Sequence, residues 1–129
     1  MSTREKKSTY AYVDASYHPQ LKIGCWGFRL QGQHTNEGIQ EFDGVASAEK
    51  MALAKCISYC KCFDIKPVII YTDHMGSLSH KNNYPDWVDV RFIKGHKKRI
   101  DKSEHDLEFT IIDRSVRKTL RKYIKENHS

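Results

Sequence analysis

The sequence predicts an α/β domain built on a mixed five-stranded sheet, and three observations support this prediction. Three consecutive strand-like segments open the chain, a segment with helical periodicity follows, and strand-like segments then alternate with helical ones. Short polar stretches separate the first three strands, which is typical of an antiparallel meander. A length of 129 residues suits one domain, so we expect a single domain over 1–129, with 1–8 flexible and 126–129 frayed.

The strand-like segments are rich in β-branched and aromatic residues. Pro67–Tyr71 is a compact apolar run, typical of a central strand that is buried on both faces. Val88–Ile93 alternates well enough to predict a fifth strand. Between them, Met75–Trp87 is polar and rich in turn residues, with room for at most a short helix. The three strands of the meander are predicted at 9–15, 24–30 and 37–42.

Two segments carry apolar residues at helical spacing. The first is Ser47–Phe63, with Ser47 in position to cap the start of the helix. The second is a long amphipathic helix from about His105 to Lys125. The predicted order is therefore three strands, helix, strand, short connector, strand and helix, with helices flanking the sheet.

The composition is mildly basic and has no membrane signature. A formal charge of +6 is consistent with a polyanionic partner, although many soluble proteins are equally basic. No apolar run approaches the roughly 20 residues of a membrane-spanning helix, and the first eight residues are too polar for a signal peptide. We therefore expect a cytoplasmic protein with no membrane contact and no obligatory protein partner.

Three of the four cysteines are close together in the sequence. Cys56 and Cys60 are one helical turn apart and Cys62 follows, so a cysteine-ligated metal site is one interpretation. No second pair of ligands stands at a suitable spacing. We therefore prefer the interpretation that these thiols lie on or near a buried helix face.

Four acidic residues occupy positions where core-forming elements rarely carry charge. Asp14 ends the first predicted strand, and Asp73 ends the buried strand. Glu49 lies in the first turn of the first predicted helix, and Asp113 lies on the apolar stripe of the last one. Each acid alone could be an ordinary capping or strand-end residue. Four converging acids would repel one another unless cations held them, and oxygen-rich clusters suit Mg²⁺ or Mn²⁺, which can clamp a phosphate.

Five short motifs follow one another on the expected elements, and together they resemble the type 1 ribonuclease H family. The resemblance extends over nearly the whole chain, from Thr9 to about Lys122, and implies a ribonuclease H-like fold. The motifs are Val13–Ser16, Ala46–Glu49, Ile70–Asp73, Phe92–His96 and Asp113–Arg114.

The resemblance implies a metal-dependent endoribonuclease that hydrolyses the RNA strand of RNA–DNA hybrids and leaves 5′-phosphates. In the implied two-metal mechanism, Asp14, Glu49 and Asp73 hold one Mg²⁺ or Mn²⁺ ion. Asp14 and Asp113 hold the second ion. His96 would assist water handling or product release.

The chain departs from the family in the groups available for holding substrate. The segment between Asp73 and His96 is too short for the basic helix with which some larger members bind hybrid. Basic residues of the last helix could touch phosphates, but we prefer to interpret them as a solvated helix face. The expected nucleic-acid-binding residues are Ser16, Ser47, Lys94, Lys97, Lys98 and Arg99, with Lys102 as a further candidate.

Two alternatives remain open. The usual family spacing after the histidine favours Asp106 as the fourth carboxylate, but Asp106 lies near a helix start, where capping explains an acid without a metal. We therefore prefer Asp113. The alternative functions are a structure-specific nuclease such as a junction resolvase, and a non-catalytic nucleic-acid-binding module of the same fold.

Overall fold

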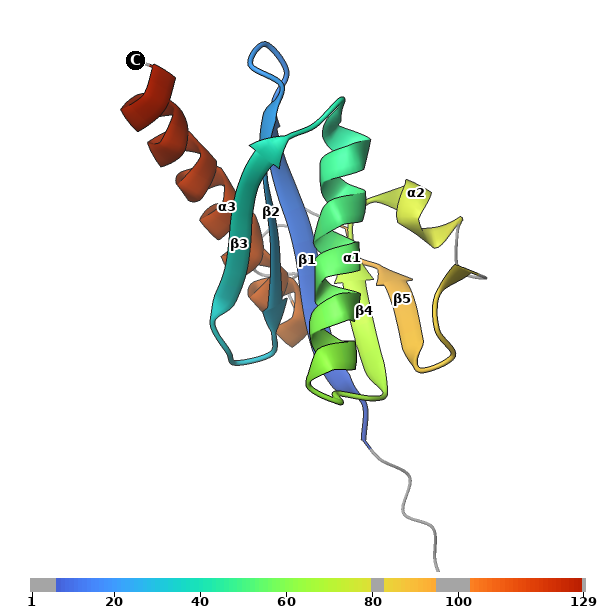
Figure 1. Cartoon of the computed structure of the whole chain (residues 1–129). Coiled ribbons are helices and arrows are strands. Elements are labelled where there is room, and N and C mark those ends of the chain that lie inside the picture. Colours follow the sequence, from blue (N-terminus) through green and yellow to red (C-terminus); the bar gives the residue numbers. More distant parts are fainter. Residues whose placement is uncertain (1–6, 80–82, 95–102, 129) are drawn as a thin grey trace, which may run out of the picture.

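The computed structural model of the chain describes residues 7–79, 83–94 and 103–128, and it contains a five-stranded mixed sheet with helices on both faces (Figure 1). β1, β2 and β3 form an antiparallel meander, and β4 and β5 continue the sheet in parallel with β1. The strand order across the sheet is β3-β2-β1-β4-β5. The predicted α/β class and mixed five-stranded sheet are therefore confirmed. The strands are β1 Thr9–His18, β2 Ile23–Leu30, β3 Thr35–Glu41, β4 Val68–Thr72 and β5 Val88–Phe92.

The central strand β1 is longer than predicted. It continues past Ala15 to His18, because β2 pairs with it as far as His18. In this pairing, Gly27 of β2 is the partner of Asp14. Its parallel pairing with β4 ends earlier, at Tyr12 opposite Tyr71. The prediction that Asp14 ends the strand is therefore wrong: Asp14 lies inside β1, just past its last pair with β4.

Helix α1 (Val45–Cys62) begins two residues earlier than predicted. Its N-cap is Gly44, in an extended conformation, and the Ala48 amide donates to the Gly44 carbonyl at 3.3 Å to close the first turn. Ser47 is the third residue of the helix, so the prediction that it caps the start is wrong. Glu49 consequently lies in the second turn and not in the first.

One core layer lies between the sheet and α1. Ala11 and Val13 of β1 face this layer and meet the buried face of α1. Cys56 and Cys60 are fully buried in it, as expected, whereas Cys62 is exposed. Within the described residues, the groups of side chains close enough to hold a metal contain no cysteine.

The second core layer lies between the sheet and α3 (Glu104–His128), which starts one residue before the predicted helix and continues past its predicted end. Figure 1 shows α3 on the face of the sheet opposite to α1. Tyr12 and Cys25 face this layer from β1 and β2. The buried residues of α3 that pack there are Phe109, Ile112, Val116 and Leu120.

Helix α3 approaches the sheet most closely at Gly27. A Cβ atom added to Gly27 would lie 2.5 Å from Val116 Cγ1 and 2.9 Å from Ile112 Cδ1, which is closer than atoms can pack. Gly27 is also the partner of Asp14 in the β1–β2 ladder. The missing side chain therefore lets α3 come close to the sheet at the level of Asp14.

The connector between β4 and β5 contains the short helix α2 (Met75–Leu78), in keeping with the limited room predicted there. It packs against α1 and β5. None of the helices in the described residues is long and apolar enough to cross a membrane.

We predict that Gly27→Ala lowers the free energy of unfolding by about 1–3 kcal/mol, since the added methyl group overpacks the contact with α3. Urea or thermal unfolding measures this change. Gly44→Ser is the control, because a Cβ there meets no atom within 4 Å and serine is a better N-cap than most residues. Its stability should equal or exceed that of the wild type. Equal stability of the Gly27 variant and the wild type would contradict the close approach of α3.

Candidate functional site

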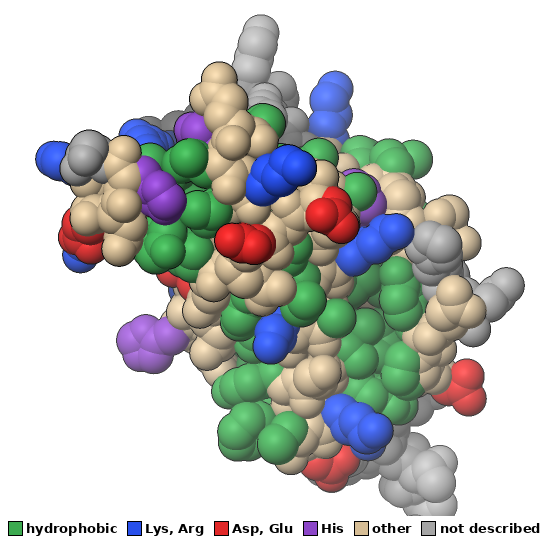
Figure 2. All heavy atoms as spheres, turned by 45° about the horizontal axis from the view of Figure 1, so that its top comes forward, with side chains coloured by type: hydrophobic (Ala, Val, Ile, Leu, Met, Phe, Trp, Pro, Cys, Tyr) green, Lys and Arg blue, Asp and Glu red, His purple; other side chains and the backbone are tan. Residues whose placement is uncertain are grey.

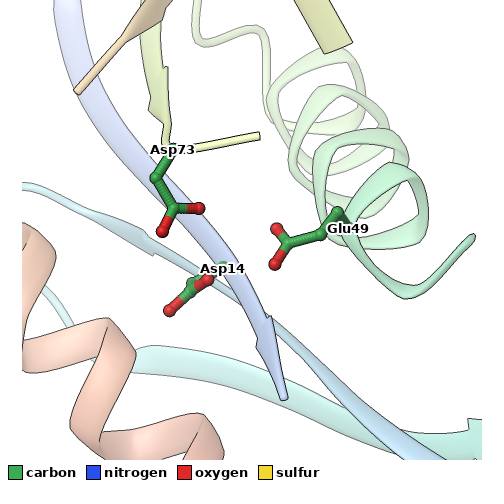
Figure 3. A group of neighbouring side chains, drawn as sticks. All are labelled: Asp14, Glu49 and Asp73. Atoms are coloured by element: carbon green, nitrogen blue, oxygen red, sulfur yellow. The ribbon is translucent and has the colours of Figure 1, made fainter. Parts of the chain in front are cut away.

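Three carboxylates converge where the parallel pairing of β1 with β4 ends (Figure 3). Asp14 comes from β1, Asp73 follows β4 directly, and Glu49 extends from α1. Two residues beyond the Tyr12–Tyr71 pair, the parallel register brings Asp14 level with Asp73. One carboxylate oxygen from each of the three acids lies within 4.8 Å of the others.

Two of these carboxylates are almost completely removed from solvent. Asp14 is 3% exposed and Glu49 is 7% exposed. In the part of the chain that the structure describes, Asp14 Oδ2 and Glu49 Oε2 are buried oxygens without a hydrogen-bond partner. Buried polar atoms are normally satisfied, because leaving one unpaired costs about 1–3 kcal/mol or more for a charged group. Within the described residues, these two buried oxygens therefore receive no hydrogen bond.

Burial and mutual repulsion both disfavour the charged forms of these acids. Desolvation raises the pKa of Asp14 well above its ordinary value, and the neighbouring charges of Glu49 and Asp73 raise it further. The pKa of Glu49 is also raised, first by burial and then by the charge of Asp73. A divalent cation would reverse this balance, because it favours the charged form of every carboxylate around it.

Asp113 lies at the edge of this cluster. Its side chain is half-buried on α3 and within hydrogen-bonding reach of Asp14, and this contact raises the pKa of Asp14 as well. An ion pair of 3.3 Å to Arg117, one helical turn further on, holds its carboxylate. The structure therefore brings the preferred fourth acid next to Asp14.

Asp106, the alternative fourth acid, is engaged in a capping box at the start of α3. Its Oδ2 accepts hydrogen bonds from the backbone N–H and the hydroxyl of Ser103, both at 2.8 Å, and its own N–H donates to Ser103 Oγ at 3.3 Å. The capping role expected from its position explains why this carboxylate is buried without needing a metal.

The chemistry of the cluster fits a magnesium or manganese ion. All of its ligand atoms are carboxylate oxygens, the type that these hard cations prefer. Two oxygens on opposite sides of a magnesium ion lie about 4 Å apart, given the usual Mg–O distance of 2.0–2.1 Å. The three carboxylate oxygens lie within 4.8 Å of one another, a spacing compatible with one coordination shell.

The structure covers only part of the predicted nucleic-acid-binding set. Ser16 lies two residues past Asp14 on the same face of β1, and Ser47 lies in the first turn of α1. Lys94 follows β5 and is exposed. The remaining predicted residues, His96, Lys97, Lys98, Arg99 and Lys102, lie outside the described residues.

Two neighbours of the site, Arg117 and His74, were not among the predicted site residues. Arg117 pairs with Asp113, and its position four residues further along the helix is the signal that could have identified it. His74 follows Asp73 and bonds through its Nδ1 to Ser77 Oγ at 2.9 Å. Burial and then Lys50 lower the pKa of His74, so its ring is neutral at physiological pH.

We predict that the metal-free protein loses stability as the pH rises above about 4.5. The folded-state pKa values of Asp14 and Glu49 exceed their ordinary values of 3.8 and 4.5, so the unfolded chain releases these protons first and deprotonation favours unfolding. Denaturant unfolding in EDTA at several pH values measures the slope. Asp14→Asn should flatten it, because one of the two protons is removed from the equilibrium. Identical slopes for the two proteins would contradict the raised pKa values.

A scan against models of known protein families and a search of curated protein sequences both found no match to this chain. What the cluster does is therefore inferred from its own geometry and chemistry. The carboxylates, their burial and their unpartnered oxygens together form a candidate site for one or more divalent cations.

Proposed function

We propose that the protein is a metal-dependent nuclease of the ribonuclease H type, which hydrolyses the RNA strand of RNA–DNA hybrids. The observation that carries this proposal is the convergence of buried carboxylates with unpartnered oxygens. Such an arrangement is unfavourable for folding alone, and perturbed groups of this kind mark functional sites. A catalytic cation site gives it a physical reason.

The order of elements supports the ribonuclease H-like part of the proposal. Three antiparallel strands, a helix, two parallel strands and a final helix follow in the order that the sequence motifs imply. The four acids come from four different elements, β1, α1, the end of β4 and α3. Motifs that are far apart in the sequence are therefore neighbours in space, as one shared site requires.

The residues have distinct proposed tasks. Asp14, Glu49 and Asp73 would hold one divalent ion, and Asp14 with Asp113 would hold a second. When bound, such ions supply a nucleophilic water and stabilise the charge of the leaving oxygen. Arg117 orients the Asp113 carboxylate through their ion pair.

The hybrid specificity is proposed from the resemblance and from one local feature. The hydroxyl of Ser16 lies on the same face of β1 as Asp14, about 7 Å further along the strand. A protein distinguishes RNA from DNA through contacts to the 2′-hydroxyl. Ser16 would contact the ribose beside a phosphate bound at the acids.

We predict that Asp14→Asn and Asp73→Asn each abolish cleavage while the protein stays folded. Each change takes one ionisable acid out of the cluster and with it the cost of desolvation and repulsion, so the stability of the metal-free protein should hold or rise. The assay incubates labelled RNA–DNA hybrid, duplex RNA, duplex DNA and a four-way junction with Mg²⁺ or Mn²⁺. Cleavage of the hybrid is expected. Cleavage of the junction in its place would favour a resolvase, and near-wild-type cleavage by either variant would exclude the metal-site assignment.

A second pair of variants separates the two C-terminal acids. Asp113→Asn should lower the cleavage rate by more than about 100-fold, the usual upper cost of removing a residue that merely supports a metal ligand. Asp106→Asn should leave the rate unchanged and lower the free energy of unfolding by no more than about 1 kcal/mol, because the asparagine oxygen can still accept from Ser103. Steady-state kinetics and denaturant unfolding measure both effects. The opposite pattern would show that Asp106 is the catalytic acid.

A further inference from the structure

A surface groove begins beside the acidic cluster and runs between β1 and α3. Its volume is about 300 Å³. The β1 side contributes Ser16 and His18, and the α3 side contributes Arg117, Leu120 and Arg121. The groove is therefore formed by the ends of the same two elements that carry Asp14 and Asp113.

The strand side of the groove is a regular row of side chains. Asp14, Ser16 and His18 alternate with residues of the other face, so all three point toward α3. Neighbours in this row are about 7 Å apart. The row therefore extends from Asp14 at the acidic cluster to Ser16 and His18 in the groove, with equal spacing between neighbours.

The helix side carries a matching row. Asp113, Arg117 and Arg121 are spaced by four residues and lie along one side of α3, about 6 Å apart. This row starts at Asp113, which contacts Asp14. Both rows consequently start at the acids and extend in the same direction, as the parallel rise of β1 and α3 in Figure 1 shows.

The polar groups of the groove are mostly hydrogen-bond donors. Arg117 and Arg121 each present a guanidinium group, which matches phosphate geometry. The Nδ1 atom of His18 accepts a hydrogen bond from the Leu21 amide at 3.2 Å, which leaves Nε2 as the donor of the ring. Among the described residues that line the groove there is no acidic side chain. An anion is thus the ligand that these groups would favour.

The overall charge of the surface around the groove would not by itself favour an anion. Figure 2 looks toward the end of the molecule at which β1 and β4 point, and it shows acidic and basic side chains interspersed with apolar ones. A polyanion would meet no broad field of one sign on this face. Binding there has to depend on the local order of donors.

We propose that this groove binds the sugar–phosphate backbone of the nucleic-acid strand that leads away from the acidic cluster. Successive phosphates would contact Arg117 and Arg121 on one side, with Ser16 and His18 as donors on the other. The inference rests on the proposed function for the identity of the strand, but the groove and its charge are independent of catalysis. It assigns Arg121 a role in substrate binding that a solvated helix face would not have.

The test compares Arg121→Gln with Lys122→Gln in an Asp73→Asn background with Mg²⁺, where the proposed function predicts binding without turnover. The two changes remove the same charge from the same turn of α3, but only Arg121 lines the groove. Fluorescence anisotropy with a labelled RNA–DNA hybrid measures the dissociation constant between 50 and 200 mM salt. Over this range the parent protein should lose about 3.5-fold more affinity than Arg121→Gln, since one phosphate contact contributes about 0.9 to the log–log slope. Lys122→Gln should keep the parent slope.

Equal effects of the two changes, or no binding of hybrid by the parent, would overturn the inference. Cleavage by the wild-type protein is measured separately. If the wild type cleaves hybrid but the two variants have equal salt slopes, the proposed function stands and the proposed role of the groove is wrong. If the wild type cleaves none of the substrates, but only Arg121→Gln lowers the salt slope, the groove binds nucleic acid and the proposed function is wrong. Circular dichroism of each variant confirms that a change in binding is not a loss of fold.

Discussion

The parallel pairing of β1 with β4 is the interaction on which the rest of the molecule depends. β1 is the central strand, with β2 and β4 beside it and a helix on each face. Its register with β4 makes Asp14 and Asp73 neighbours. A slip of one residue would turn one of these acids to the opposite face of the sheet. The apolar residues on both faces of β1 prevent this slip, so the packing of the core determines the geometry of the acids.

Folding has to stabilise a cluster that is unfavourable by itself. Asp14 and Glu49 are buried, so water solvates them far less than it solvates surface acids. The hydrophobic core offsets the cost of gathering these charges. Anything that binds the cluster only in the folded state adds its binding free energy to stability. The affinity of such a ligand and the stability of the fold would therefore be two measures of the same interaction.

Most of the fold could be predicted from the sequence, because each element has a clear period and composition. The errors arose where tertiary contacts decide. β1 runs past Ala15 because β2 provides a partner there, which no local pattern in β1 indicates. The helix predicted from Ser47 starts earlier, since Gly44 adopts the extended N-cap conformation. The acids of the site were identifiable from their strand and helix positions. The groove beside them could not be predicted. It depends on how α3 packs against the sheet at Gly27, which is a tertiary contact.

The capping box of α3 also determines where the C-terminal part of the chain must keep a constant length. The start of the helix is fixed by Ser103 with Asp106, and by the 2.7 Å hydrogen bond between the Tyr12 hydroxyl and His105 Nδ1. From Asp106 to Asp113 is seven residues (113 − 106), or about two helical turns. One residue inserted between them would rotate Asp113 by about 100° away from Asp14. Changes of length outside this interval leave the spacing from Asp106 to Asp113 intact, whereas the first two turns of α3 must keep their length.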